Sequence, residues 1–341
     1  MNILLTSAGR RTYMVEYFKK ALNGKGLVFA SNSCMSPALK AADGYFITPL
    51  IYDSEYIPFL LAECKKRKID MIVSLFDADL PVLSKYRDIF AEAGARIAIS
   101  GPETIKYCND KYLMASKLSE YGISCPRTFI DPEAVIAEIE NGKMSFPVII
   151  KPRYGMGSIG LYRAFSPEEL KAACGMCRRE VFNTYLRFES EAVRDECVII
   201  QEIRQGSEYG LDVISDLEGG YITTIVRKKL AMRAGETDEA IVLGEDDREY
   251  AVLQRLGAGI ARALGPSGLI DADVIMDEKS PEPCVIDINA RFGGGYPFSH
   301  LAGADVPRAY VLFAEGRDEE AKKYLRTVPG THGYKEIVVK A

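Results

Sequence analysis

The fold class of this chain is decided by the stretch Phe146-Pro147-Val148-Ile149-Ile150-Lys151-Pro152-Arg153-Tyr154-Gly155-Met156-Gly157-Ser158-Ile159-Gly160. Its apolar first part predicts a strand, which ends at Lys151 and runs directly into a glycine-rich loop. Gly155, Gly157 and Gly160 form a G-x-G-x-x-G pattern, which by itself is a weak signal for a nucleotide phosphate. The segment that follows the loop therefore determines how the pattern is interpreted.

A second strand, and not a helix, is predicted directly after the glycines. The residues Leu161-Tyr162-Arg163-Ala164-Phe165 alternate as strand residues do, and a helix start appears only at Ser166-Pro167-Glu168-Glu169. A dinucleotide-binding loop instead opens a helix, because the helix N-terminus carries the pyrophosphate. A glycine loop between two strands is typical of a flap over a triphosphate, so we expect Lys151 to point at the phosphates. A dinucleotide-dependent oxidoreductase is the distant alternative.

Length and composition indicate a globular chain of two or three domains. Of the 341 residues, 48% are hydrophobic and 27% are charged, and no apolar run reaches the ~18 residues of a membrane span. The start, Met1-Asn2-Ile3-Leu4-Leu5-Thr6, lacks the basic region and cleavage site of a signal peptide, so we expect a cytoplasmic location. With 43 Lys and Arg against 48 Asp and Glu, the net charge of −5 argues against nucleic-acid binding.

The eight cysteines are scattered, and Cys174 and Cys177 form the only C-x-x-C pair. Such a pair could be a redox couple or half of a zinc site. The pair lies inside a helical pattern, and the only histidines are His300 and His332. We therefore interpret both as ordinary helix cysteines in a reducing compartment.

Short apolar strands alternate with amphipathic helices over the first hundred residues. Strands are predicted at 3–5, 27–30, 45–47, 70–74 and 95–99, and helices at 10–22, 56–66 and 80–93. This order indicates a parallel sheet covered on both faces. Ligands of such sheets bind at the carboxyl ends of the strands.

Charged side chains occupy the loops at two of those strand ends. Arg10 or Arg11 could hold a substrate carboxylate bidentately, and a solvated helix start is the equal alternative. Asp77 and Asp79 follow the strand predicted at 70–74. We interpret them as loop and helix N-cap residues rather than catalytic ones.

Two segments in the middle of the chain suit a nucleotide. Lys111 stands in the first turn of a predicted helix, where the helix dipole disfavours a cation, so it is either a tolerated surface lysine or a phosphate ligand. The strand predicted at 197–200 passes into the irregular polar segment 201–208. That segment could offer adenine a backbone carbonyl and N–H, and Glu208 could accept hydrogen bonds from the ribose. A plain loop is the alternative.

A β-hairpin near the C-terminus carries the candidate metal ligands. Its predicted strands cover 269–276 and 284–291, and its loose turn covers 278–283. Asp287, Asn289 and Arg291 alternate along the second strand and share a face, and the pairing brings Asp273 opposite Asp287 and Asn289. Carboxylate and amide oxygens are ligands that Mg²⁺ prefers. We favour a metal site over a merely solvent-facing polar surface, because three glycines follow at 293–295.

The order of these features resembles the ATP-grasp superfamily, and specifically single-module relatives of the carbamoyl-phosphate synthase large chain. The resemblance is carried by 146–152, by Asp287-Ile288-Asn289-Ala290-Arg291-Phe292 and by Asn109-Asp110-Lys111. It implies a mixed α/β and α+β fold in three parts. These are a Rossmann-like N-terminal domain at 1–108, an ATP-grasp small subdomain with a glycine-rich lid at 109–200, and a C-terminal subdomain with the metal site at 201–341.

The resemblance also implies a role for each candidate residue. Asp273 and Asp287 stand where the family usually has glutamate or glutamine, which puts the metal geometry in question. Substrate or γ-phosphate contacts are implied, more weakly, for the basic segment 227–229. The implied ATP ligands are Lys111, Lys151, Gly155, Gly157, Ser158, Gly160, Gln201, Glu202, Ile203 and Glu208. The implied ligands of two Mg²⁺, with Mn²⁺ as a substitute, are Asp273, Asp287 and Asn289. The implied catalytic residues are Arg291 and Lys151.

The activity implied by the resemblance is an ATP-dependent carboxylate–amine ligation. A small-molecule carboxylate would attack the γ-phosphate to give an acylphosphate and ADP, and an amine would then displace phosphate. Complete carbamoyl-phosphate synthesis uses two such modules, and this chain has one, so we expect a ligase rather than a complete synthase. The alternatives are a partial reaction of the carbamoyl-phosphate synthase type, a small-molecule kinase, and a nucleotide-binding module without chemistry. The resemblance also allows a homodimer.

Overall fold

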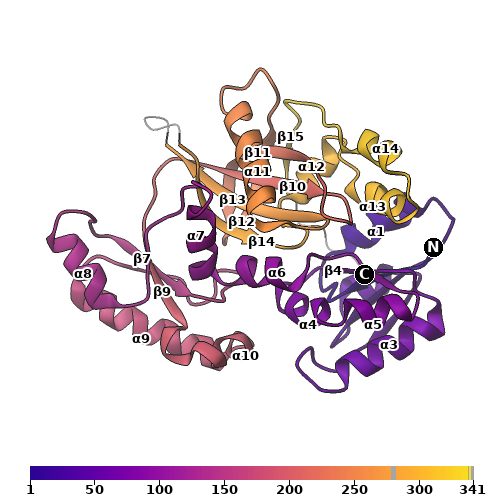
Figure 1. Cartoon of the computed structure of the whole chain (residues 1–341), viewed down its shortest axis with the longest axis horizontal. Helices are drawn as coiled ribbons and strands as arrows, with labels where there is room; N and C mark the ends of the chain where they lie inside the picture. Colours follow the sequence, from indigo (N-terminus) through magenta and orange to yellow (C-terminus); the bar gives the residue numbers. More distant parts are fainter. Residues whose placement is uncertain (278–281, 337, 339–341) are drawn as a thin grey trace.

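The computed structural model describes residues 1–277, 282–336 and 338 of the chain. Three β-sheets organise these residues (Figure 1), with strand orders β3-β2-β1-β4-β5, β6-β9-β7-β8 and β14-β13-β10-β11-β12-β15. The strands are β1 (Ile3–Thr6), β2 (Val28–Asn32), β3 (Gly44–Ile47), β4 (Met71–Ser74), β5 (Arg96–Ile97), β6 (Thr128–Phe129), β7 (Val148–Pro152), β8 (Tyr162–Ala164), β9 (Val198–Glu202), β10 (Ser207–Ser215), β11 (Tyr221–Arg233), β12 (Glu236–Val242), β13 (Leu269–Met276), β14 (Cys284–Asn289) and β15 (His332–Tyr334).

The helices cover these sheets and connect them. The α-helices are α1 (Thr12–Leu22), α2 (Pro37–Ala41), α3 (Tyr56–Arg67), α4 (Leu80–Ser84), α5 (Arg87–Glu92), α6 (Pro102–Asn109), α7 (Lys111–Ser119), α8 (Pro132–Glu140), α9 (Pro167–Asn183), α10 (Arg187–Ser190), α11 (Tyr250–Leu264), α12 (Tyr296–Leu301), α13 (Val306–Ala314) and α14 (Asp318–Ala321). Short 3₁₀ segments are η1 (Asp77–Asp79), η2 (Glu191–Glu196) and η3 (Lys322–Leu325). Across the described ranges, no helix is both long and apolar enough to span a bilayer.

The N-terminal sheet is parallel and buried on both faces, as the sequence predicts. Strand β1 pairs in parallel with β2 and with β4. Successive side chains of β1 enter two different cores: Leu4 packs with the residues of α3, α4 and α5, whereas Ile3 and Leu5 pack with those of α1. The single helix expected at 80–93 is two short helices, α4 and α5, separated at Lys85 and Tyr86.

The second sheet confirms that a strand follows the glycine loop. Strand β8 pairs antiparallel with β7, so the loop from Arg153 to Leu161 connects two neighbouring strands. The sequence after the loop predicts one helical stretch from Glu168 to about Arg194, but α9 already ends at Asn183. There Thr184 is extended, with φ −122° and ψ −180°, and its hydroxyl donates to the Val181 carbonyl. The chain then turns through α10 towards the N-terminal domain (Figure 1).

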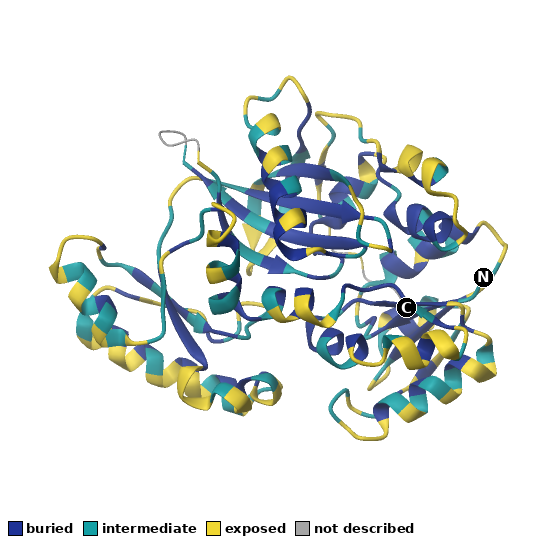
Figure 2. Ribbon diagram, viewed as in Figure 1, coloured by how far each residue is buried: buried dark blue, intermediate teal, exposed yellow. Residues whose placement is uncertain are grey.

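The six-stranded sheet forms the centre of the molecule. Figure 2 shows that its strands are largely buried, whereas the outer face of α9 is exposed. An apolar stripe in the sequence predicts a helix from Asp246 to Leu264. In the structure, helix α11 packs Leu253 and Ile260 of this stripe against the six-stranded sheet. The helix starts at Tyr250 rather than at the expected Asp246, because the Asp247 carboxylate accepts from the Gly244 N–H and the preceding residues form a turn.

Aromatic contacts join the second sheet to the N-terminal domain. The ring of Tyr52 stacks on that of Phe188 in α10 with centroids 4.4 Å apart, and Phe76 meets Tyr185 at 5.6 Å. The Asn109 amide donates to Glu189 at 3.1 Å. These contacts close the molecule around the carboxyl ends of β1 and β4, where ligands of a parallel sheet bind.

Candidate active site

The hairpin β13–β14 presents an acidic face. Of the two residues expected opposite Asp273, the structure confirms one. Asp273 lies opposite Asp287, but Asn289 lies opposite Asp271 and not opposite Asp273. Antiparallel strands pair residue by residue in opposite directions, so the pairing of Asp273 with Asp287 itself places Asn289 opposite Asp271. A bulge shifts the register only beyond Asp273, at Val274. The turn predicted at 278–283 falls mostly outside the described residues, at 278–281.

Lys111 reaches this face from the first turn of α7. Its ammonium is ion-paired with the Asp287 carboxylate. Asp110 fixes the first turn of α7, and with it Lys111, because its carboxylate accepts from the N–H groups of Tyr112 and Leu113 as an N-cap. Asp110 also accepts from the Arg153 guanidinium at 2.9 Å, so the end of β7 and the start of α7 are held together. Lys111 is therefore a buried, ion-paired lysine and not a solvated surface residue.

Lys151 approaches the same strand from the end of β7. Its Nζ lies 3.5 Å from the carbonyl oxygen of Ile286. Burial, and then the charge of Lys111, lower the pKa of Lys151 to about 8, against the opposing effect of Asp287 and Asp273. Burial would raise the pKa of Asp287, but the nearby lysines hold it below the usual value for aspartate. Asp287 is thus an ionised carboxylate between two lysines.

Lys229 in β11 lies between Glu208, the candidate ribose ligand, and Asp273, a candidate metal ligand. Its Nζ lies 2.7 Å from Asp273 Oδ1 and 3.7 Å from Glu208 Oε2. Burial opposes the charge of Lys229, but Asp273 raises its pKa, so the lysine is protonated. Of the basic segment 227–229, Lys229 is therefore the residue that faces the candidate nucleotide site.

Arg291 is held by a carboxylate of the N-terminal domain. Its Nε and Nη2 donate to Asp77 Oδ2 at 3.0 and 2.7 Å, and Nη2 also donates to Asn289 Oδ1 at 3.2 Å. Asp77 was interpreted from the sequence as a loop residue, and it does lie in the loop after β4. Its pairing with Arg291 is the feature that the sequence did not reveal.

Asp79 occupies the N-cap position of α4, as expected, but its side chain makes no capping hydrogen bond and instead forms a polar centre of the N-terminal domain. Its carboxylate is buried and caps no N–H. It accepts instead from the hydroxyls of Thr6, Tyr56 and Ser74 at 2.5, 2.6 and 2.9 Å, and from Ser7 at 3.2 Å. These bonds tie the ends of β1 and β4 together beneath the candidate site.

A buried ionic cluster that the sequence did not predict supports the acidic hairpin. Arg227 pairs with Asp212, donates to Ser299 Oγ at 2.8 Å, and contacts Asp271 Oδ1 at 2.9 Å. Burial, and then the neighbouring charge of Asp273, raise the pKa of Asp271 to about 7, although Arg227 opposes this. The alternation Asp271-Ala-Asp273 was the signal that both acids share a face.

Small residues make room for the Arg227 guanidinium. A Cβ atom at Gly210 or at Gly295 would fall within 3.0 Å of it. Gly293 likewise leaves room for the Asp271 carboxylate. The glycine-rich segment after Arg291, which the sequence associated with a large ligand, therefore serves at least in part to pack the ionic cluster.

The glycine loop reaches across to the turn between β11 and β12. A Cβ atom at Gly235 would fall closer than 3.0 Å to the Ser158 hydroxyl, so the two turns are in contact. Gly157 and Gly160 have φ of 62° and 68°, and Ser158 has φ of 58°. This left-handed run suits glycine and shapes the tip of the loop. Gly155, before the tip, packs against Pro152.

The side chains at the end of β9 are engaged within the protein. Gln201 is buried and donates to the Thr128 hydroxyl at 2.8 Å. Glu202 accepts from the Arg127 N–H at 3.2 Å and from Arg204 at 3.4 Å. Ile203 follows directly after the strand. A base bound here would therefore be recognised by main-chain groups of 201–203 rather than by these two side chains.

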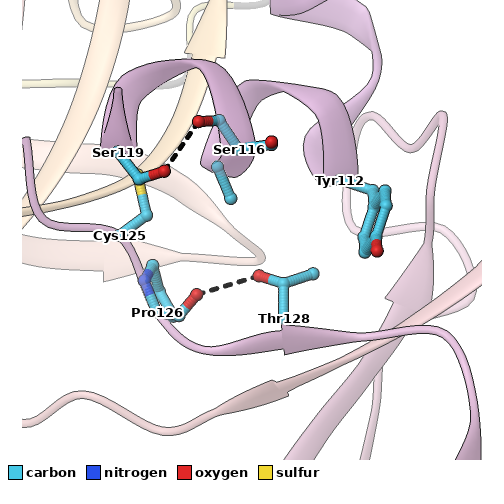
Figure 3. Close-up of a pocket in the computed structure, with 7 residues that line it drawn as sticks. Tyr112, Ser116, Ser119, Cys125, Pro126 and Thr128 are labelled. Atoms are coloured by element: carbon cyan, nitrogen blue, oxygen red, sulfur yellow. Dashed lines mark hydrogen bonds between the residues drawn. The ribbon is translucent and has the colours of Figure 1, made fainter. Parts of the chain in front are cut away.

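A separate pocket of about 270 Å³ lies on another face of α7 (Figure 3). It contains none of the candidate site residues, because Lys111 and Met114 are buried on the opposite side of the helix. The pocket is lined by Tyr112, Ala115, Ser116, Ser119, Cys125, Pro126 and Thr128.

The donor chemistry of the hairpin fits Mg²⁺ bound together with a nucleotide. Within the described ranges, no three His, Cys, Asp or Glu side chains form a closed metal cage. Mg²⁺ is usually held by one or two carboxylates plus substrate phosphates and water, rather than by a protein cage. Asp273, Asp287 and Asn289 offer hard oxygen atoms on one side of β13 and β14, which is the set such a site needs.

The cysteines provide no alternative centre. All eight are free thiols. Cys174 and Cys177 lie in α9, where burial raises the pKa of both thiols, to about 11 and about 12. Raised thiol pKa values disfavour the thiolate that redox chemistry and zinc binding require.

Family comparisons agree with this geometry. Residues 3–98 match the PylC-like N-terminal domain, and residues 144–296 match the ATP-grasp domain. The chain thus contains an ATP-grasp domain over residues 144–296. It is related to the carbamoyl-phosphate synthase large chain and carries a PylC-like N-terminal domain in front of its ATP-grasp domain.

Similar proteins are much longer than this chain. The multifunctional protein pyrABCN of Emericella nidulans is 22% identical over 324 residues, which is 88% of this chain and 13% of that protein. The carbamoyl phosphate synthase large chain of Clostridium botulinum is 24% identical over 294 residues, which is 80% of this chain and 26% of that protein.

Solved structures share the fold over nearly the whole chain. Biotin carboxylase from Campylobacter jejuni, in a complex with β,γ-ATP, has a TM-score of 0.73 at 18% identity and covers 92% of this chain and 71% of its own. The L-amino acid ligase from Bacillus licheniformis has a TM-score of 0.68 at 18% identity and covers 96% and 77%. These matches confirm the α/β N-terminal domain followed by an ATP-grasp fold.

Proposed function

We propose that this protein is an ATP- and Mg²⁺-dependent ligase that joins a small carboxylic acid to an amine through an acylphosphate. The observation that carries the proposal is the convergence of Lys111 and Lys151 on Asp287, with Arg291 at the end of the same strand. Two lysines around an acidic, oxygen-rich strand suit a triphosphate and its metal. An arginine beyond them suits the group that receives the phosphoryl.

The related proteins support this reaction class. The chain is related to the carbamoyl-phosphate synthase large chain and shares its fold with biotin carboxylase and an L-amino acid ligase. We propose the division 1–108, 109–200 and 201–341 for its N-terminal domain, lid subdomain and metal-binding subdomain. We further propose that two Mg²⁺ ions are bound, that Mn²⁺ substitutes for them, and that the protein acts in the cytoplasm as a homodimer.

In the proposed mechanism the protein positions the reactants and neutralises charge. Lys111 and Lys151 hold the α- and β-phosphates, the loop 155–160 covers them, and Glu208 binds the ribose. Asp273, Asp287 and Asn289 hold the metal, which when bound neutralises the phosphate oxygens. Arg291 stabilises charge at the transferred phosphoryl.

Each step balances without a protein nucleophile. The substrate carboxylate oxygen attacks the γ-phosphorus, the bond to the β,γ-bridging oxygen breaks, and ADP leaves. The amine then attacks the acyl carbon, loses a proton, and expels phosphate. Because water would hydrolyse the acylphosphate, the closed loop over the site has a protective role.

The decisive experiment measures ADP and phosphate release from purified protein with Mg²⁺, ATP and panels of carboxylic acids and amines. We expect release of both products only when a suitable acid and amine are present together. A stable phosphorylated product that needs no amine would establish a kinase instead. Tight binding of NAD without binding of ATP would contradict the whole assignment.

Two variants test the site itself. Lys151→Ala and Asp287→Asn should each reduce turnover by at least about 100-fold, because each removes a charge that acts on the triphosphate. Lys143→Ala is the matched control, since that lysine is 57% exposed and its ion pair among the described residues is with Glu138. Circular dichroism would verify folding of each variant. Full activity of either site variant would overturn the assignment.

A further inference from the structure

Helix α1 brings the N-terminal domain against the segment that follows Arg291. The Tyr17 ring stacks on the His300 imidazole with centroids 3.6 Å apart. Phe18 meets Phe292 edge-on at 6.1 Å. Because β1 pairs in parallel with β4, the loop that leads from β1 into α1 lies at the same strand ends as Asp77, which binds the guanidinium of Arg291.

Arg11, the residue that precedes the first turn of α1, is a cation without a carboxylate partner. Among the residues that the structure describes, no carboxylate oxygen lies within the 4.0 Å of an ion pair from Arg11. The two acids whose charges act on Arg11 are engaged elsewhere. Asp77 pairs with Arg291 at 2.7 Å, and Glu236 pairs with Lys335 at 3.6 Å.

The surroundings of Arg11 are positive. Burial, and then the charge of Arg291, lower the pKa of Arg11. No acidic side chain stands in the first turn of α1, whose dipole adds positive potential at this end. Burial raises the pKa of the nearby Tyr13, so its hydroxyl remains neutral. Two arginines and a helix N-terminus at one edge of the parallel sheet favour an anion.

The two arginines face different parts of the site. Arg291 donates to Asn289, which places it beside the candidate metal ligands. Arg11 lies in the loop between β1 and α1, and therefore belongs to the N-terminal domain. A ligand that reaches both would have one end at the phosphoryl and the other end at the N-terminal domain.

We propose that Arg11 binds a second carboxylate of the acid substrate, while the reacting carboxylate lies at Arg291. This inference rests on the proposed ligase function and specifies its substrate class as a dianionic acid. It also decides between the two arginines of the loop, because Arg10 is exposed and Arg11 is not.

The test compares acids that differ only in the second charge. The probes are glutarate and succinate against their monomethyl esters, and L-glutamate against L-glutamine. Calorimetry with Mg²⁺ and β,γ-methylene-ATP gives the dissociation constants for the wild type, Arg11→Gln, Arg11→Lys and the neighbouring control Arg10→Gln. ADP release with ATP is measured in parallel.

We expect the wild type and Arg10→Gln to bind at least one diacid about tenfold or more tightly than its half-ester, because a charge-assisted hydrogen bond is lost in the ester. Arg11→Gln should lose this preference, and Arg11→Lys should retain part of it. The melting temperature of Arg11→Gln should be unchanged or higher, because an unpaired cation beside Arg291 is removed. A purely structural arginine would instead lower it.

Other outcomes overturn the inference. These are equal binding of diacids and half-esters by the wild type, no diacid binding, or an unchanged preference in Arg11→Gln. If Arg11→Gln weakens binding of inorganic phosphate but keeps the diacid preference, Arg11 serves the phosphoryl group and the inference is wrong. Diacid selectivity without ADP release would contradict the ligase proposal alone, and ADP release without selectivity would contradict only this inference.

Discussion

Arg291 and Asp77 are 214 positions apart in the chain, yet two nitrogen atoms of the arginine donate to one carboxylate oxygen of the aspartate. The contact joins the N-terminal domain to the end of the acidic hairpin. It also leaves Asp77 Oδ1 buried without a hydrogen-bond partner among the described residues. Asp77 therefore fixes the orientation of the Arg291 guanidinium from the N-terminal domain.

Replacing Asp77 should impair turnover without abolishing nucleotide binding. In Asp77→Ala, Arg291 loses a charge-assisted acceptor, and we expect kcat/KM to fall by roughly 10- to 100-fold, since such bonds contribute about 1.5–3 kcal/mol. ADP release gives the rate, and ATP binding is measured by calorimetry. Asp88→Ala, at an exposed position of the same domain, is the control. Equal rates for the two variants would show that Arg291 does not depend on Asp77.

The buried cluster around Arg227 should be a main determinant of stability. Arg227→Met leaves the carboxylates of Asp212 and Asp271 without their cation in the interior, so we expect a loss of about 3–5 kcal/mol in the free energy of unfolding. Urea denaturation measures this. Arg233→Met removes an arginine that is 61% exposed and paired with Asp238, and should cost less than about 1 kcal/mol. Similar losses for both would refute the assigned role of the cluster.

The contact between the glycine loop and the β11–β12 turn can be tested with a matched pair of alanines. Gly235 and Gly142 have φ of 80° and 70°, but only at Gly235 would a Cβ atom meet the Ser158 hydroxyl. Both substitutions carry a backbone cost of about 1 kcal/mol. Only Gly235→Ala should also raise the KM for ATP severalfold, because the loop can no longer close against the turn. An unchanged KM in Gly235→Ala would show that this contact does not hold the loop.

ATP binding should weaken as the pH rises above about 8. Lys151, which faces Lys111, Asp287 and Asp273, has its pKa lowered to about 8, so it loses its positive charge above that pH. We expect the dissociation constant for ATP to be flat below pH 8 and then to rise by up to about tenfold per unit. Lys151→Arg should bind ATP with little pH dependence over the same range. A flat wild-type curve from pH 7 to pH 9.5 would contradict this.

The same pKa has a consequence for stability. Because the pKa of Lys151 in the folded protein is below its ordinary value of 10.5, the folded state releases this proton first. The unfolded chain then binds more protons between pH 8 and 10.5, and the contribution of Lys151 to the free energy of unfolding rises with pH over that window. The folded protein therefore carries the cost of this buried charge at neutral pH.

Local patterns in the sequence were enough to predict the fold class. For each candidate contact they also indicated one of the two partners, but not the other. The strand after Gly160, the alternation of Asp287, Asn289 and Arg291, and the position of Lys111 in a first turn all follow from periods of two or 3.6 residues. These periods determine which face a side chain occupies, and they need no knowledge of the rest of the chain.

Only the tertiary structure decided what lies opposite each of those faces. The pairing of Arg291 with Asp77, the bridge from Lys229 to Asp273 and Glu208, and the cluster around Arg227 join residues from different strands or domains. The register of the hairpin placed Asp271, and not Asp273, opposite Asn289. Such contacts depend on sheet order, register and domain packing, which are set by burial over the whole molecule and leave no local pattern in the sequence.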